Sequence, residues 1–450
     1  MWGGVAVSDG KSCIPCLRAA AEYDMVWEMK GAFSMMDFHK LIDSYKTCSC
    51  GMEHRCDIRD IRVGSGLVHQ VGSILRENQF PEKILLVADQ KTLQAAEGIL
   101  ESLKGFTVTT YVYDTLRVAT MDDVRLVESF FDRVDGVLAV GTGSIHDPSR
   151  MACARHNKPL CLFGTAPSMD GFASYSAPIV DGNFKTTHPA KCPEVIIADT
   201  KILTAAPVEL KAAGFGDMIS KYIALIDWQV SHLLTGEHYC EKVAGLTRAA
   251  TDRLMSMADK VTLNDEETAG AVFESLIMTG IAMSFTLTSR PGSGTEHIMA
   301  HYWECMELLE GRIPNYHGED VGVATLIMLE YYNKLAQLPA VKAQKERNDW
   351  DDIYASYGVL ADDVRKLNTP DTITDPIDPQ DIERLWPEIV AIIRSVPSYA
   401  ECLRAMKQAG CKTTMEEIGK DPDFVAKSFR YHPYMRRRLS LRRVANLIDE

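Results

Sequence analysis

The chain has 450 residues, of which 46% are hydrophobic and 24% are charged, and its formal net charge is -14. This length exceeds what a single hydrophobic core usually serves, so we expect a globular protein of two domains. The acidic balance excludes general nucleic-acid binding, which needs clustered Lys and Arg to neutralise phosphates.

The N-terminal end shows no targeting signal. Met1-Trp2-Gly3-Gly4-Val5 lacks the basic segment followed by an apolar segment that is typical of a signal peptide. Apolar runs such as residues 84–88 have the length of a strand, far below the roughly 20 residues of a membrane-spanning helix. We therefore expect no membrane span. The 12 cysteines are expected to be reduced thiols, so we predict a cytoplasmic protein.

Residues 1–55 form an N-terminal extension that contains cysteines. Cys48-Ser49-Cys50 is followed by His54 and Cys56, and Cys13 with Cys16 could complete a metal site. Zinc knuckles usually have two well-separated ligand pairs, whereas these residues are crowded. We interpret them as reduced thiols in loops and strands, and a metal site is the alternative.

Residues 56–204 alternate short β-branched runs with amphipathic segments. This alternation predicts βαβ units and a parallel sheet, hence an α/β nucleotide-binding domain. Residues 179–185 predict a hairpin with its turn at Asp181-Gly182-Asn183. The predicted strands are residues 83–88, 106–113, 134–140 and 159–163, and the predicted helices are residues 90–103, 121–131 and 145–156.

Residues 205–450 change character, because apolar residues recur at helical spacing and strand patterns nearly vanish. We predict an all-α domain. Its clearest helices are expected over residues 217–235, 237–259, 266–287, 295–310 and 320–336.

A glycine turn follows one predicted strand. Gly141-Thr142-Gly143-Ser144 precedes Ile145, and such a turn lets the backbone approach a pyrophosphate at a helix N-terminus. A complete dinucleotide fingerprint needs glycine at position 146, which is His, so a tight turn without ligand is equally open. Asp89 ends an earlier strand, where it could accept a hydrogen bond from a ribose hydroxyl or cap the next helix.

A second polar loop, Thr165-Ala166-Pro167-Ser168-Met169-Asp170, continues to Ser174. It follows the strand ending at Phe163, at the carboxyl edge of the sheet, where ligands bind in open α/β folds. Asp170 is therefore a candidate site residue, and a turn former is the alternative.

The predicted helical domain holds a possible metal site. His297 and His301 are four residues apart and share a helix face. With Asp217 and His317, His297 would form a set of one carboxylate and two imidazoles that leaves coordination positions open, as catalytic sites do. Buried structural histidines are the alternative.

Together these motifs resemble the sn-glycerol-1-phosphate dehydrogenases, a branch of the iron-containing alcohol dehydrogenase and dehydroquinate synthase-like superfamily. The resemblance covers about residues 55 to 445. It rests on Ala166-Pro167-Ser168-Met169-Asp170-Gly171, Gly216-Asp217 with Lys221 and Asp227-Trp228, Ser289-Arg290-Pro291-Gly292-Ser293-Gly294 before Glu296-His297, Ala300-His301 with Glu304, and His317-Gly318. Its turn at Gly141 reads Gly-Thr-Gly where the superfamily usually has three glycines.

The resemblance implies a site with three parts. Asp217, His297 and His317 would bind a divalent metal, expected to be Zn2+, with Ni2+ or Fe2+ also suited. Asp170 and His301 would contact substrate, with His301 placed to relay a proton. The residues implied to contact NAD(H) or NADP(H) are Gly141, Thr142, Gly143, Ser144, Ile145, Thr165, Ala166, Pro167, Ser168 and Ser174.

The implied reaction is the reversible reduction of dihydroxyacetone phosphate to sn-glycerol 1-phosphate. We expect Arg290 to hold the substrate phosphate, with Lys185 as the second candidate; a structural ion pair is the alternative for Arg290. The rival functions are glycerol oxidation, a dehydroquinate-synthase-like cyclisation and a catalytically silent binding protein. Asp89 favours NADH over NADPH, and apolar helices in the second half lead us to expect a homo-oligomer.

Overall fold

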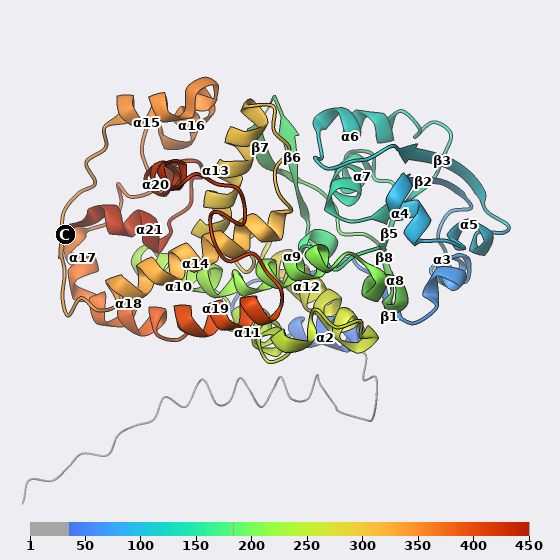
Figure 1. Cartoon of the computed structure of the whole chain (residues 1–450), viewed down its shortest axis with the longest axis horizontal. Coiled ribbons are helices and arrows are strands. Elements are labelled where there is room, and N and C mark those ends of the chain that lie inside the picture. The colour runs from blue at the N-terminus through green and yellow to red at the C-terminus, as the bar shows by residue number, and fades with distance from the viewer. Residues whose placement is uncertain (1–35, 183, 450) are drawn as a thin grey trace, which may run out of the picture.

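The computed structural model describes residues 36–182 and 184–449, so Cys13, Cys16, the N-terminal five residues and Asn183 lie outside the described part. The first half is a six-stranded sheet in the order β1-β8-β5-β4-β2-β3, with every neighbouring pair parallel. Helices lie on both of its faces (Figure 1). The strands are β1 (Asp60–Gly64), β2 (Lys83–Asp89), β3 (Thr107–Tyr113), β4 (Gly136–Gly141), β5 (Leu160–Gly164) and β8 (Val195–Asp199).

The parallel arrangement follows from strands that are apolar on both faces. In β2, Ile84 and Leu86 belong to one buried cluster, and Leu85 and Val87 belong to the cluster on the opposite face. Such strands suit a sheet covered by helices on both sides. The helices of this half are η1 (Leu67–Gln70), α3 (Val71–Glu77), α4 (Gln90–Ala95), α5 (Ile99–Ser102), α6 (Met121–Glu128), α7 (Gly143–His156) and η2 (Gly171–Ala173).

Two local predictions need correction. The single helix expected over residues 90–103 is divided into α4 and α5, because Gly98 adopts a φ of 93° that a continuous helix excludes. The N-terminal extension expected as loops and strands contains a helix, α2 (Phe38–Tyr45), capped by Asp37. The predicted hairpin is present as antiparallel β6 (Ser176–Asp181) and β7 (Phe184–Pro189).

The second half is helical, apart from the short antiparallel pair β9 (Lys342–Ala343) and β10 (Ile448–Asp449). Its longer helices are α9 (Val208–Ile219), α10 (Lys221–Thr235), α11 (Glu241–Met255), α12 (Glu266–Thr286), α13 (Thr295–Leu309) and α14 (His317–Leu335). The remaining ones are α8 (Thr200–Ala205), η3 (Ala258–Lys260), α15 (Trp350–Tyr357), η4 (Gly358–Leu360), α16 (Ala361–Asn368), α17 (Pro379–Arg384), α18 (Trp386–Ile393), α19 (Tyr399–Gln408), α20 (Pro422–Tyr431), η5 (His432–Tyr434), α21 (Leu441–Val444) and η6 (Ala445–Leu447).

Helix α12 joins the two halves. It is long and apolar enough to cross a membrane by length and composition, the one such helix in the described part of the chain, but its most apolar stretch is wholly buried inside the protein. Its Phe273 ring packs on Phe172 of η2, with ring centroids 4.6 Å apart. A Cβ added to Gly280 would lie 2.9 Å from Ala173 Cβ, so the helix contacts the loop after β5 directly. This contact fixes the polar loop that contains Asp170.

Candidate active site

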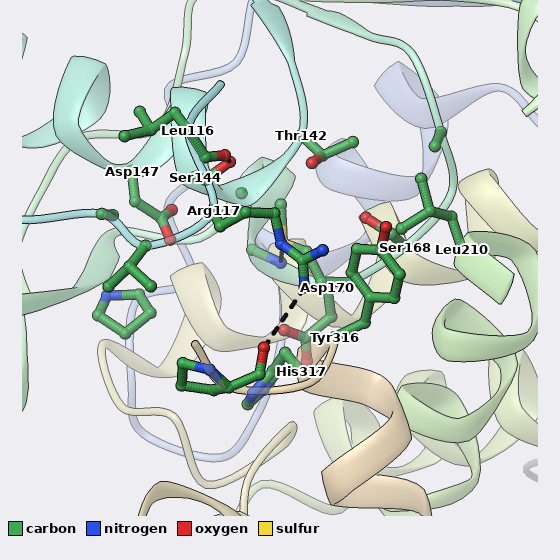
Figure 2. A pocket seen from close by; sticks show the side chains of 18 of the residues that line it. Leu116, Arg117, Thr142, Ser144, Asp147, Ser168, Asp170, Leu210, Tyr316 and His317 are labelled. Atoms are coloured by element: carbon green, nitrogen blue, oxygen red, sulfur yellow. Dashed lines mark hydrogen bonds between the residues drawn. The ribbon is translucent and has the colours of Figure 1, made fainter. Parts of the chain in front are cut away.

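A cavity of about 660 Å³ lies where the carboxyl ends of the strands face the helical half. Figure 2 shows Thr142, Ser168 and Asp170 directed toward it from the sheet side, and Tyr316 and His317 from the other. The predicted site residues that line the cavity are Asp89, Thr142, Gly143, Ser144, Thr165, Ala166, Ser168, Asp170, Ser174, Lys185, His297, His301 and His317.

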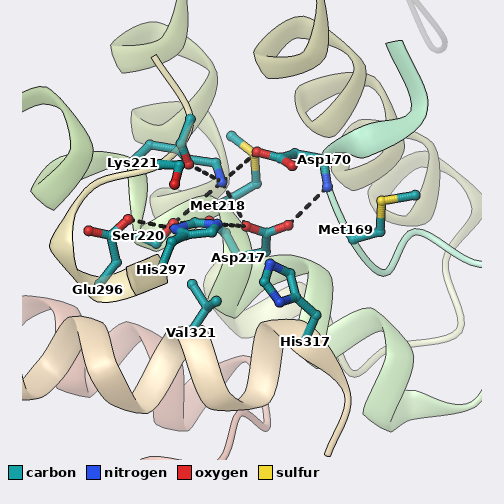
Figure 3. A network of polar contacts seen from close by, with 12 residues as sticks. Met169, Asp170, Asp217, Met218, Ser220, Lys221, Glu296, His297, His317 and Val321 are labelled. Carbon is teal, nitrogen blue, oxygen red and sulfur yellow. Dashed lines mark hydrogen bonds and ion pairs between the residues drawn. The ribbon is translucent and has the colours of Figure 1, made fainter. Parts of the chain in front are cut away.

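The predicted metal ligands converge at one end of this cavity. The donor atoms of Asp217, His297 and His317 lie within 4.8 Å of one another. Asp217 comes from the last turn of α9, His297 from the first turn of α13, and His317 begins α14. Three helix ends therefore hold the cluster rigidly (Figure 3).

Carboxylates orient the imidazoles. Glu296 Oε1 lies 2.6 Å from Nδ1 of His297, whose Nε2 lies 3.5 Å from Asp217 Oδ1. Glu304 contacts Nδ1 of His317 at 3.1 Å and Nδ1 of His301 at 2.7 Å. A carboxylate on one ring nitrogen leaves the other directed at a ligand, an arrangement that metal-binding histidines usually show.

A buried ammonium balances the carboxylates beside the cluster. Lys221 Nζ lies 2.7 Å from Asp217 Oδ1 and 2.7 Å from Asp170 Oδ2, and it donates to the Gly292 carbonyl at 2.9 Å. Burial opposes the charged form of Asp217, but Lys221 and the bond to His297 outweigh it and hold the pKa of this carboxyl well below its usual range. The carboxylate is therefore ionised and ready to accept a cation.

The side chains of His297 and His301 differ in charge. Burial alone would lower the pKa of His297, but its bonds to Asp217 and Glu296 raise it to about 9. The negative charge that favours a proton on this ring would equally favour a divalent ion. For His301, burial lowers the pKa to about 3 despite Glu304, so this ring is neutral. The donor set of one carboxylate and two oriented imidazoles fits a divalent metal with open positions.

Comparison with known proteins identifies the family of this chain. Residues 62–207 match the family model of the iron-containing alcohol dehydrogenases. The glycerol-1-phosphate dehydrogenase (NAD(P)+) of Halalkalibacterium halodurans is 35% identical over 299 residues, which cover 64% of this chain and 75% of that protein. The protein of the same name from Methanothermobacter thermautotrophicus is 34% identical, over 72% of this chain and 86% of that protein. The chain belongs to the glycerol-1-phosphate dehydrogenase family.

Solved structures show the fold of this family member at lower identity. The NADH-dependent butanol dehydrogenase A of Thermotoga maritima superposes with a TM-score of 0.58 at 13% identity, over 88% of this chain and 94% of that one. A probable glycerol dehydrogenase from Sinorhizobium meliloti gives a TM-score of 0.58 at 16% identity, over 84% and 89% of the two chains. The predicted fold, a parallel α/β half followed by a helical half, is confirmed.

Three predicted nucleotide contacts and one predicted metal ligand do not line the cavity. Gly141, Ile145, Pro167 and Asp217 are absent from its lining. A Cβ on Gly141 would lie 2.9 Å from Ile145 Cγ1, so this glycine allows close packing between β4 and α7. The cavity surface itself is formed by Thr142, Gly143 and Ser144.

Arg290 is placed differently from the expectation. Its guanidinium is buried against Glu237, with Nε 2.8 Å from Oε1, and it donates to the Leu439 carbonyl at 2.7 Å. It does not line the cavity. The expected phosphate contact by Arg290 is therefore corrected: the structural ion pair satisfies this side chain. Lys185 does line the cavity and contacts Glu304 at 2.9 Å.

Several site residues were missed or underweighted by the sequence reasoning. Glu304 is three residues after His301 on the same face of α13, and Lys221 is four residues after Asp217, at the junction where α9 ends and α10 begins. No sequence motif pointed to Arg117, yet this residue lines the cavity, with its guanidinium 4.1 Å from the Tyr316 ring centroid (Figure 2). Asp89 keeps both expected roles open, because it lines the cavity and also caps α4 through Thr92.

Proposed function

We propose that this protein catalyses the metal-dependent, NAD(P)H-linked reversible reduction of dihydroxyacetone phosphate to sn-glycerol 1-phosphate. The observation that carries the proposal is one cavity that connects the glycine turn after β4 with the cluster of Asp217, His297 and His317. Membership of the glycerol-1-phosphate dehydrogenase family supports the same reaction.

Asp217, His297 and His317 would hold the divalent ion. Zn2+ is the expected metal, and Ni2+ or Fe2+ would suit the same donors. When bound, the metal supplies Lewis-acid stabilisation of negative charge on the substrate oxygen. Lys221 keeps Asp217 ionised, and Glu296 and Glu304 hold the imidazoles in orientation.

His301 is proposed to handle the proton. Its Nδ1 contacts the Glu304 carboxylate at 2.7 Å, so in the neutral ring Nδ1 carries the hydrogen and Nε2 is free to accept. The residue lines the cavity one helical turn after His297. In the oxidation direction Nε2 would accept a hydrogen bond from a substrate hydroxyl, and in reduction a proton would return by the same contact. Asp170, held by Lys221, is proposed to bind a second substrate hydroxyl.

The nucleotide is proposed to bind along the sheet edge. Helix α7 begins at Gly143, so its first N–H groups face the cavity beside Thr142 and Ser144, where a pyrophosphate would be stabilised. The loop with Thr165, Ala166, Ser168 and Ser174 would contact the rest of the cofactor. The nicotinamide supplies the hydride, while these residues set its distance from the metal-binding end.

The test uses purified protein, measured for metal content and for NADH oxidation with dihydroxyacetone phosphate. We expect His297→Ala and His317→Ala each to lose one metal equivalent per chain and nearly all turnover, while circular dichroism stays helical. His156→Ala, an exposed histidine at the end of α7, is the matched control and should keep both. Full turnover by His297→Ala, or by wild type after exhaustive chelation, would contradict the proposal.

The same assay distinguishes the rival functions. A glycerol dehydrogenase would oxidise glycerol better than sn-glycerol 1-phosphate. A cyclase would need several cations converging on a carboxylated substrate. Of the cations that line the cavity, Lys185 pairs with Glu304 and Arg117 lies over the Tyr316 ring, both beside the proposed metal ligands. A silent binding protein would retain NADH affinity without turnover of any of these substrates.

A further inference from the structure

A second group of metal-binding side chains lies outside the cavity. Cys48, Cys50, His54 and Cys240 place their ligand atoms within 4.8 Å of one another. Cys48 Sγ lies 3.7 Å from Cys240 Sγ, and His54 Nε2 lies 3.3 Å from Cys50 Sγ and 3.4 Å from Cys240 Sγ. Three residues come from the segment after α2, and Cys240 immediately precedes α11.

We propose that these four residues bind a structural Zn2+ ion. A tetrahedral site with Zn–S near 2.3 Å and Zn–N near 2.0 Å separates its donor atoms by about 3.5–3.8 Å. The separations of 3.3, 3.4 and 3.7 Å come close to this geometry. A disulfide would need sulfurs about 2.05 Å apart, so the Cys48–Cys240 pair fits shared coordination better.

The histidine is set up as a ligand. His54 Nδ1 lies 2.9 Å from the Phe285 carbonyl, which can only accept, so Nδ1 carries the hydrogen and Nε2 presents its lone pair to the sulfurs. This side chain and Cys240 are fully buried, and Cys48 and Cys50 are half-buried. Four protein donors would leave no open coordination position for a substrate, as is typical of structural zinc sites.

The donor set also corrects the grouping suggested by the sequence. Cys56 was grouped with Cys48, Cys50 and His54, but its thiol faces Cys192 instead. The fourth ligand, Cys240, is 186 residues from His54 along the chain. A motif search over neighbouring positions therefore could not find it.

The proposed ion would connect three elements. It would tie the segment after α2 to the start of α11, and His54 extends the link to the last turn of α12 through Phe285. Glu237, three residues before Cys240, holds Arg290 of the loop that leads to α13. The site would thus stabilise the helical half at a place separate from the cavity lining, and it adds a second metal to the proposed enzyme.

The experiment uses full-length protein in which Zn2+ is replaced by Co2+. We expect sulfur-to-cobalt charge-transfer bands, which the oxygen and nitrogen donors of Asp217, His297 and His317 cannot produce. X-ray absorption of the zinc protein should show sulfur at about 2.3 Å. His297→Ala should keep the thiolate bands, so this outcome is independent of the proposed function.

Variants locate the site. Cys240→Ser and Cys48→Ser should each lose one zinc equivalent per chain and lower Tm by roughly 5 °C or more. Cys56→Ser, from the same segment, is the matched control and should keep the bands and the zinc. If Cys240→Ser does not fold, the wild-type spectra decide alone. No sulfur around the metal, a Cys48–Cys240 disulfide in a non-reducing peptide map, or equal zinc loss in Cys56→Ser would overturn the proposal.

Discussion

At the scale of single residues, Lys221 neutralises the carboxylates beside the proposed metal site. Its fully buried ammonium contacts the Asp170 and Asp217 carboxylates and a carbonyl, so each of these three charges has a partner. Unpaired burial of even one of these charges would cost several kcal/mol. Because Asp170 and Asp217 share this one lysine, the substrate-binding loop and the metal-binding helix are coupled through its ammonium group.

Lys185 is the residue we expect to recognise the substrate phosphate. Lys185→Gln keeps a hydrogen-bond donor to Glu304 but removes the charge. We expect the KM for dihydroxyacetone phosphate to rise about 10- to 100-fold, from loss of a charge-assisted contact of ~1.5–3 kcal/mol. Steady-state kinetics with phosphorylated and unphosphorylated dihydroxyacetone measures the effect.

The control for this prediction is Lys201→Gln, which removes another lysine from the cavity lining, on α8. It should leave the preference for the phosphorylated substrate unchanged. Equal losses of Lys185→Gln on both substrates would mean that Lys185 only orients Glu304. The phosphate contact would then have to come from another group of the cavity lining, such as Arg117.

Asp89 is predicted to favour NADH over NADPH. Its Oδ1 accepts from Thr92 N at 2.8 Å, and its carboxylate lines the cavity where a 2′-phosphate would be repelled. Asp89→Ser keeps a capping oxygen and removes the charge. We expect kcat/KM for NADPH to rise relative to NADH. A strong NADPH preference of the wild-type enzyme would show that Asp89 does not contact the ribose.

At the scale of elements, local patterns predicted most of the fold. The strands β2, β4 and β5 were predicted from short runs of apolar residues, which are buried in the structure, and the edge strand β3 was predicted from its alternating pattern. Gly98 was read as part of a helix, because a single glycine at positive φ cannot be recognised without the turn that requires it.

The candidate site was predictable where its chemistry is local. Asp217, His297 and His317 were chosen as metal ligands, and the structure brings their donor atoms together, although their roles stay predictions. Arg290 and Cys240 show what local patterns miss. Arg290 forms an ion pair with Glu237, and Cys240 contacts His54. Both partners are distant in the sequence and are brought near only by tertiary packing.

The corrected position of Arg290 leads to a prediction about stability. Arg290→Ala would remove the cation that pairs with Glu237, although this carboxylate would keep its hydrogen bond from the Ser231 hydroxyl of α10. Because Glu237 is about one-third exposed, at 32%, solvent reduces the cost, which we expect to be about 1–3 kcal/mol.

Thermal unfolding and kinetics together check this prediction. Tm should fall, and the KM values for phosphorylated and unphosphorylated substrates should change by the same factor. Arg384→Ala, which removes an exposed ion pair to Asp381, is the control and should change Tm little. A selective rise in the KM for the phosphorylated substrate in Arg290→Ala would instead support a direct contact between Arg290 and the phosphate.

At the scale of the whole molecule, the expected homo-oligomer stays a prediction. The apolar helices that suggested a subunit interface are buried within one chain, α12 completely so. The exposed large hydrophobic side chains of the described residues, such as Leu263 and Val359, are few. Light scattering at micromolar concentration tests the prediction, and a mass of 50.1 kDa, that of one chain, would contradict it.

Gly280 of α12 makes one of the close contacts that set the relative position of the two halves. Gly280 of α12 packs on the backbone of Ala173, where an added Cβ would lie 3.0 Å from the Cα atom and could not be relieved by a side-chain movement. Ala173 precedes Ser174 in the loop that lines the proposed nucleotide site. Gly280→Ala should therefore separate the halves slightly, at a net cost of about 1–2 kcal/mol after the gain in helix propensity.

Gly270→Ala is the matched control on the same helix. Its added Cβ would meet only the Thr200 Cγ2 atom at 3.3 Å and Val63 Cγ1 at 3.8 Å, both side-chain methyls. We expect Gly280→Ala to lower Tm and raise the KM for NADH, and Gly270→Ala to leave Tm unchanged or higher, because Ala is favoured in a helix by ~0.5–1 kcal/mol. Equal behaviour of the two variants would mean that the loop at Ala173 yields to α12, and that this contact does not position the cofactor.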